Sequence, residues 1–113
     1  SALNTEWAGS GVRVHALVDY YQKGRTLIRD YLQQKHGWDN ATVGSHAGTS
    51  DTSQLLYVHA AGIRRDKLAP SGGSPDSGVN GDPTKASAEI GKVAIDFKVN
   101  AAVAQFRAMK SAP

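Results

Sequence analysis

Apolar residues recur every three or four positions in the first half of the chain, over residues 14–35. This spacing places them on one face of a helix, which is typical of a helix that packs against a core. Gly24 falls in the same stripe, where a glycine costs about 1 kcal/mol relative to alanine. Either another backbone packs closely against Gly24 or it is a tolerated surface residue. The other residues of the stripe are Leu17, Tyr20, Tyr21, Leu27, Ile28, Tyr31 and Leu32.

A second, shorter helix is predicted over residues 51–61. Asp51 is followed three residues later by Gln54, which fits the capping pattern in which a carboxylate and an amide satisfy the first backbone N–H groups. Leu55, Leu56 and Val58 supply apolar surface after this cap.

The longest predicted helix covers residues 83–110, with Asp82 as its cap and Pro83 as its first residue. Proline suits that position because its φ is fixed and its N–H is absent. A helix with two apolar sides needs neighbours on both sides, so we expect it to pack against something outside this chain. One stripe contains Ile90, Val93, Ala94, Phe97, Ala101 and Ala104, and the other contains Ile95, Val99, Val103 and Phe106.

The composition is that of one soluble globular domain spanning residues 1–113, because 40% of the residues are apolar and 20% are charged. The apolar spacing predicts that this domain is mainly helical with little strand. No apolar run is long enough to cross a bilayer, which predicts no membrane segment. No export signal is visible, which favours a cytoplasmic location. The net charge of +3 is spread along the chain, with Arg64 and Arg65 as the one adjacent basic pair. This pattern argues against nucleic-acid binding. Cysteine is absent, which excludes disulfides and thiolate chemistry.

Among the four histidines, His46 stands out because it lies between small residues just before a predicted helix start. Backbone N–H groups at such a position favour an anion, and an imidazole there can carry protons near neutral pH. A loop histidine tied to Asp51 or to a backbone group explains the residues equally well. Ser45, His46 and Asp51 are close in sequence, but a catalytic triad is a matter of spatial geometry, so adjacency is no evidence for one.

Several sequence blocks together resemble the carboxyl-terminal part of the creatininase (creatinine amidohydrolase) family. The blocks are "DYYQKGRTLIRDYL", "SHAGTSDTSQLL", "GIRRDKLAP" and "GVNGDPTKASAEIGK", the last followed by a long helix. The resemblance implies a metal-dependent hydrolase of C–N bonds in cyclic or small amides, with a three-layer α/β/α fold and commonly an oligomeric assembly. The three helices, at residues 14–35, 51–61 and 83–110, would form the mainly helical carboxyl-terminal portion of that fold.

The resemblance also implies roles for individual residues. His46 corresponds to the family's proton-relaying histidine, and Asp51 stands where many members carry the glutamate of an ETS triplet, so both are expected to be catalytic. Members that act on creatinine often have an acidic residue where this chain has Ser45, which argues against creatinine as the substrate. The expected substrate-binding residues are Ser45, Gly48, Ser53 and Asp82.

The family's metal-binding segments, an ExHGxHLP-like stretch and a later HxE, do not occur in these 113 residues. Zinc or manganese is therefore expected for the complete family site but not for this chain alone. One hypothesis makes the chain the carboxyl-terminal portion of an amidohydrolase that is active only with its other half, either a complementary amino-terminal chain or the missing part of a longer gene product. The other makes it a non-catalytic helical remnant that forms a homo-oligomer or binds a partner protein.

Overall fold

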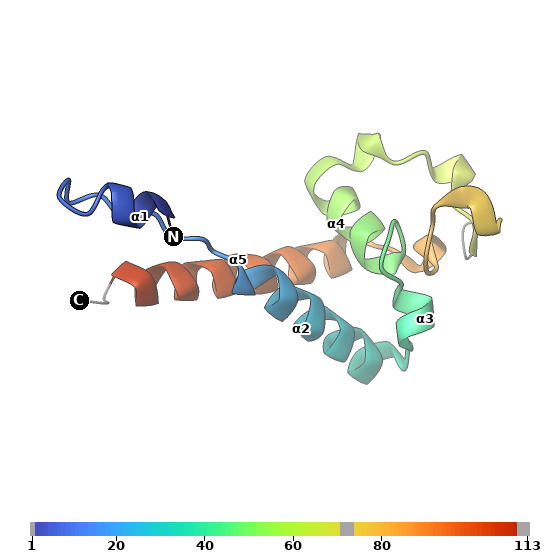
Figure 1. The fold of residues 1–113 in the computed structure, drawn as a ribbon. Helices are drawn as coiled ribbons and strands as arrows, with labels where there is room; N and C mark the ends of the chain where they lie inside the picture. Colours follow the sequence, from blue (N-terminus) through green and yellow to red (C-terminus); the bar gives the residue numbers. More distant parts are fainter. Residues whose placement is uncertain (1, 71–73, 111–113) are drawn as a thin grey trace.

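The computed structural model describes residues 2–70 and 74–110, and helices joined by loops make up its architecture (Figure 1). Two long helices, α2 and α5, run against each other, and α4 packs across the first part of α5. Short 3-10 turns η1, η2, η4 and η5 cover Ala60–Gly62, Arg65–Lys67, Pro75–Ser77 and Pro83–Lys85. The α-helices are α1 (Ala2–Glu6), α2 (Asp19–His36), α3 (Asn40–Val43), α4 (Thr49–His59) and α5 (Ala88–Lys110).

The expected three-layer α/β/α fold is wrong for the described part of the chain. These residues contain no strand, and their one β-type pairing is an isolated bridge between His46 and Asn80. A sheet needs several extended segments of alternating polarity, whereas the long apolar patterns here have helical spacing. The expected number of three helices is also wrong, because α1 and α3 form as well. In α3 the Asp39 side chain accepts the Thr42 N–H at 2.8 Å, which caps the helix.

Helix α2 begins at Asp19, five residues later than the predicted start at residue 14. The preceding segment is held by a side chain of α1 instead, since Asn4 exchanges two hydrogen bonds with the backbone of Val14, at 2.7 and 2.8 Å. The predicted stop is close to the observed one. Gly37 takes a left-handed conformation with φ 70° and donates its N–H to the Gln33 carbonyl at 2.9 Å.

Helix α4 begins at Thr49, and the predicted capping box is wrong. Gly48 is the N-cap residue and offers no side chain. Asp51 lies within the first turn, where its Oδ2 accepts the Ala47 N–H at 3.2 Å. Gln54 donates to the Ser50 carbonyl at 3.1 Å instead of reaching back to the cap. Asp51 therefore fixes the backbone before the helix, and backbone geometry at Gly48 sets the helix start.

Helix α5 begins at Ala88, so the predicted start at Pro83 is wrong. Asp82 and Pro83 do serve as cap and first residue, but of the 3-10 turn η5, which ends when Ala86 takes an extended conformation with ψ 143°. The Ser87 Oγ then accepts the Ile90 N–H at 3.2 Å. A second capping interaction thus starts the long helix.

The core lies between α2, α3 and the first half of α5. Two glycines allow the helices to approach. A β-carbon at Gly24 would lie 2.6 Å from the Lys98 Cγ, and one at Gly91 would overlap the Ser53 carbonyl. Gly24 is therefore buried against Lys98, whose side chain makes the close approach and whose Cα would lie 3.5 Å from the added β-carbon. Leu56 of α4 is also buried, and the main cluster of buried core residues is Ile28, Leu32, Val43, Ile90 and Ala94.

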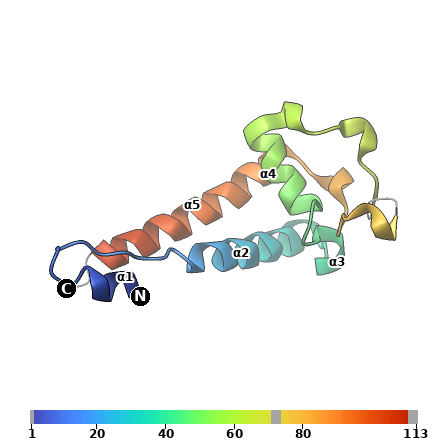
Figure 2. The ribbon, with the colours of Figure 1, turned by 45° about the horizontal axis from the view of Figure 1, so that its top comes forward.

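The molecule is elongated, with extents of 56 × 29 × 25 Å and a radius of gyration of 17.9 Å. A compact domain of this length has a radius of gyration of about 13 Å. The second half of α5 projects from the core, and the segment before α2 runs beside it (Figure 2). Among the described residues, no helix combines the length and apolarity needed to cross a membrane.

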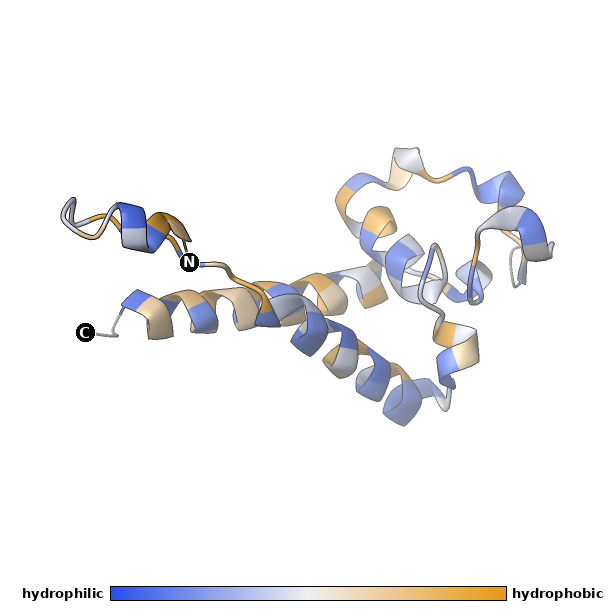
Figure 3. Ribbon diagram, viewed as in Figure 1, coloured by the Kyte–Doolittle hydropathy of each residue, from blue (hydrophilic) through white to orange (hydrophobic). Residues whose placement is uncertain are grey.

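Apolar residues continue along α5 to its far end (Figure 3). Val99, Val103 and Phe106 are 52%, 40% and 57% exposed. These residues belong to the second predicted stripe, which the described part of the chain leaves uncovered over this stretch.

Candidate functional site

The loop that carries His46 connects α3 to α4 and is fixed by the segment around Asn80. The Asn80 N–H donates to the His46 carbonyl at 2.8 Å, and the Ser45 N–H lies 3.1 Å from the Asn80 carbonyl. The Asn80 Oδ1 also accepts from the Ser45 N–H and hydroxyl, both at 2.9 Å. One asparagine therefore holds the backbone on both sides of the His46 amide.

Three buried glycines allow these two segments to meet. A β-carbon at Gly81 would lie 2.6 Å from the Gly44 Cα, and one at Gly48 would lie 2.5 Å from the Asn80 carbonyl oxygen. Gly44 and Gly81 also have positive φ values, 74° and 111°, which favour glycine. Backbone contact therefore replaces side-chain packing at this junction.

The His46 side chain is exposed. Within the described ranges its ring makes no hydrogen bond, ion pair or ring contact, so it is free to meet a group from outside. The next residue, Ala47, has a φ of 49°, the one positive value at a non-glycine residue of the described chain. Such a conformation is uncommon and turns the chain sharply between His46 and α4.

Asp51 is exposed like His46, and its bond to the Ala47 N–H supports the turn that follows the histidine. The two residues therefore belong to one local structure. Their link runs through the backbone of Ala47, because no hydrogen bond or ion pair joins the two side chains in this part of the structure.

The other expected site residues serve mainly structural roles. Gly48 is buried as the N-cap of α4. Ser53 is fully buried, donates to the Thr49 carbonyl at 2.6 Å and accepts the Ser87 N–H at 3.1 Å, so it joins α4 to the start of α5. Asp82 accepts from the Thr84 N–H and hydroxyl at 3.0 and 2.6 Å, and lies 3.8 Å from the Lys85 ammonium. Ser45 remains at the edge of a cleft.

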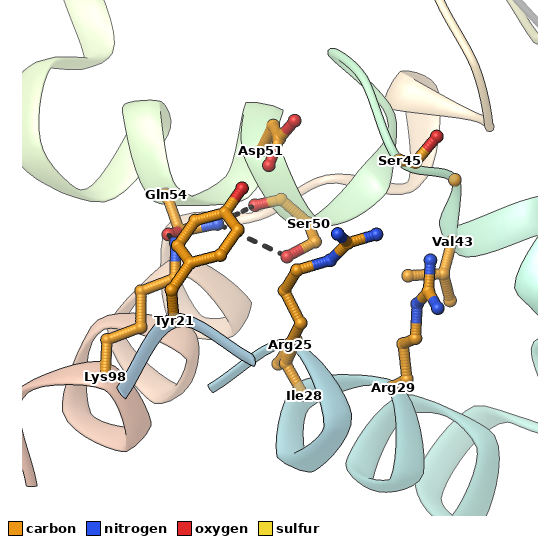
Figure 4. A pocket seen from close by; sticks show the side chains of 11 residues that line it. Tyr21, Arg25, Ile28, Arg29, Val43, Ser45, Ser50, Asp51, Gln54 and Lys98 are labelled. Atoms are coloured by element: carbon orange, nitrogen blue, oxygen red, sulfur yellow. Dashed lines mark hydrogen bonds between the residues drawn. The ribbon is translucent and has the colours of Figure 1, made fainter. Parts of the chain in front are cut away.

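That cleft lies between α2 and the start of α4 (Figure 4). Arg25 and Arg29 line one side, and Ser45, Ser50 and Asp51 line the other. Sequence reasoning missed the two arginines and Asn80. The four-residue spacing of the arginines on a predicted helix was an available signal, whereas nothing local marks Asn80, which meets Ser45 from 35 positions away.

The residues of the described chain do not fit a metal. They contain no group of three or more His, Cys, Asp or Glu side chains that could hold one. His46 and Asp51 are joined only through the backbone of Ala47, and no third metal-binding side chain of the described residues lies with them. Any metal of a complete family site would have to be held by other residues.

Comparison of the chain with protein-family models, with curated proteins and with solved structures finds no match in any of the three.

Proposed function

We propose that this chain supplies His46 as a proton relay to a creatininase-family hydrolase that cleaves C–N bonds of a small or cyclic amide. The observation that carries the proposal is the free, exposed imidazole on a loop whose backbone is hydrogen-bonded on both sides. The order of the sequence blocks around His46 supports the choice of family.

His46 gives a proton to the leaving nitrogen as the C–N bond breaks, and takes back the proton that the attacking water releases. An imidazole suits this task because it exchanges protons near neutral pH. Asp51 acts as a positioning residue, since its carboxylate holds the Ala47 N–H beside the histidine. Asn80 holds the other side of the same backbone.

A family member also needs zinc or manganese, which activates the attacking water when bound. The described residues of this chain do not fit such a metal, and a complementary amino-terminal chain is the proposed source of its ligands. We assign no step of the reaction to this chain beyond the proton transfer at His46.

A second candidate is a non-catalytic helical protein that self-associates or binds a partner protein. The exposed apolar residues Val99, Val103 and Phe106 on α5 favour it, because side chains of this kind usually lie at an interface when they are clustered.

Native mass spectrometry and metal analysis of the chain, purified together with any chain that binds it, discriminate between the two candidates. Metal retained at about one ion per chain, with release of amine from a panel of cyclic amides, supports the hydrolase. A metal-free oligomer without turnover supports the second candidate.

The role of His46 is tested by His46→Ala in the preparation that shows turnover. We expect turnover to be lost while the far-ultraviolet circular dichroism stays unchanged, because the ring makes no contact that stabilises the fold. His15→Ala is the matched control, since His15 is also exposed but lies before α2. Unchanged turnover in His46→Ala would remove the histidine from the mechanism.

A further inference from the structure

The cleft between α2 and α4 is small and polar. Its free volume is about 20 Å³, roughly the space that one water-sized group needs. Figure 4 shows the Arg25 side chain extending from α2 toward Ser50 and the Arg29 side chain extending toward Val43. The enclosed part of the cleft therefore holds about one water, and a larger polar group would lie at its mouth, beside the charged side chains.

Arg25 and Arg29 lie four residues apart, so they occupy neighbouring positions on one face of α2. They flank the buried side of the helix, next to Ile28, and both are half-buried. Like charges at this spacing repel each other, and partial burial reduces the screening by water. The pair carries an electrostatic cost in the absence of an opposite charge.

In the described residues no carboxylate forms an ion pair with either arginine. Neither guanidinium makes a hydrogen bond or an ion pair in the described residues. Arg25 makes a cation–π contact, with its guanidinium carbon 5.9 Å from the centre of the Tyr21 ring. Asp51, the one carboxylate that lines the cleft, accepts the Ala47 N–H instead. The third cation of the cleft, Lys98, is engaged with the Gln54 Oε1 at 2.6 Å.

We infer that the cleft lined by Arg25 and Arg29 binds a small oxyanion, the carboxylate or phosphate group of a small molecule. The planar guanidinium presents paired N–H donors that match the oxygens of either group. Ser50 adds a further donor on the opposite wall, because its Oγ accepts from the Gln54 Nε2 at 3.3 Å and its own proton remains to be donated. This site does not involve His46 and does not depend on amide hydrolysis.

The test is a nuclear magnetic resonance titration of the chain with inorganic phosphate and, separately, with acetate, at constant ionic strength. We expect the Ser45 and Ser50 amide signals to shift in a saturable way with one or both anions. Arg25→Gln/Arg29→Gln should weaken this binding at least tenfold. Tighter binding of phosphate identifies a phosphate ligand, and tighter binding of acetate identifies a carboxylate ligand.

The matched control is Arg64→Gln/Arg65→Gln, which removes the same charge from two exposed residues outside the cleft. An equal loss of affinity in this control would show that binding depends only on net charge, and would overturn the inference. Shifts that do not saturate with either anion would also overturn it. If the double variant of α2 unfolds, the single variants Arg25→Gln and Arg29→Gln are titrated instead, and each is expected to weaken binding.

Discussion

The two ends of the molecule use apolar residues in opposite ways. At the compact end, where the second half of α2 and the first half of α5 meet α3 and α4, the core residues Leu32 and Ala94 are completely buried. At the extended end, formed by residues 2–18 and the second half of α5, no residue is buried. Val103 and Phe106 there are 40% and 57% exposed although they continue the apolar pattern of the helix.

The difference shows that apolar pattern alone does not build a core. The compact end also has backbone-to-backbone contacts at glycines and buried hydroxyls that are all bonded, as at Ser53 and Thr49. Within the described residues, no buried side-chain nitrogen or oxygen lacks a hydrogen-bond partner. The extended end has only the contacts of a short segment along one helix.

The largest effect is expected from Leu32→Ala at the compact end. This side chain is fully buried, and its truncation should lower the free energy of unfolding by about 2–5 kcal/mol, since it leaves a cavity. Leu27→Ala on the same helix is the control, because Leu27 is 41% exposed. Chemical denaturation measures both variants, and equal losses would contradict the location of the core.

A somewhat smaller effect is expected from Gly91→Ala. The added β-carbon would overlap the Ser53 carbonyl, so α4 and α5 must move apart, and we expect a loss of about 1–3 kcal/mol in the free energy of unfolding. Gly9→Ala at the extended end has nothing within 4 Å of its added β-carbon and should be nearly neutral. A stable Gly91→Ala variant, measured by thermal unfolding, would argue against the close helix contact.

A third, smaller effect concerns the pH dependence of stability. The Thr42 N–H bond lowers the pKa of Asp39, so the folded state binds this proton less readily than the unfolded state. The stability that the charged cap adds is present above the unfolded pKa of about 3.9 and is lost as the pH falls through the lower, folded pKa.

Asp39→Asn keeps an acceptor at the cap and removes the titration. Thermal unfolding of both proteins between about pH 5 and pH 3 should therefore show a steeper loss of stability in the wild type. Parallel curves would contradict a lowered pKa. Helix α2 at the extended end offers no such cap, because its N-cap residue, Val18, makes no side-chain hydrogen bond.

The smallest effect on stability is expected from Phe106→Ala. An exposed residue far from the core should change the free energy of unfolding of the monomer by about 0.5 kcal/mol or less. Analytical ultracentrifugation tests whether the same change weakens self-association, as the second candidate function requires. A loss as large as that of Leu32→Ala, measured on the monomer, would mean that the extended end contains a core of its own.

The two long helices could be predicted from the sequence, whereas most of the helix boundaries could not. The stop of α2 near Gly37 follows from a local rule about glycine. The starts of α4 and α5 depend on competition between nearby caps. Asp51 and Asp82 are both good cap residues. In the folded chain Asp51 accepts the Ala47 N–H, and Asp82 caps the turn η5 through the Thr84 N–H, so neither caps the helix predicted to follow it.

The candidate site was predictable only in part. His46 and Asp51 attract notice in the sequence, and the structure places both at the surface of one turn. Ser53 looked equally available, and its burial between α4 and α5 could not be read from its neighbours in sequence. The expected sheet came from the family resemblance and not from the patterns of this chain, whose apolar spacing is helical.

Local pattern is enough to show that α2 and α5 are long helices, because helical hydrogen bonds join residues four positions apart and the apolar spacing reports them directly. Contacts between residues far apart in the chain set which parts of those helices are covered and what holds the His46 loop. The Asn80 contact to Ser45 spans 35 positions, and no local pattern encodes a hydrogen bond over that distance.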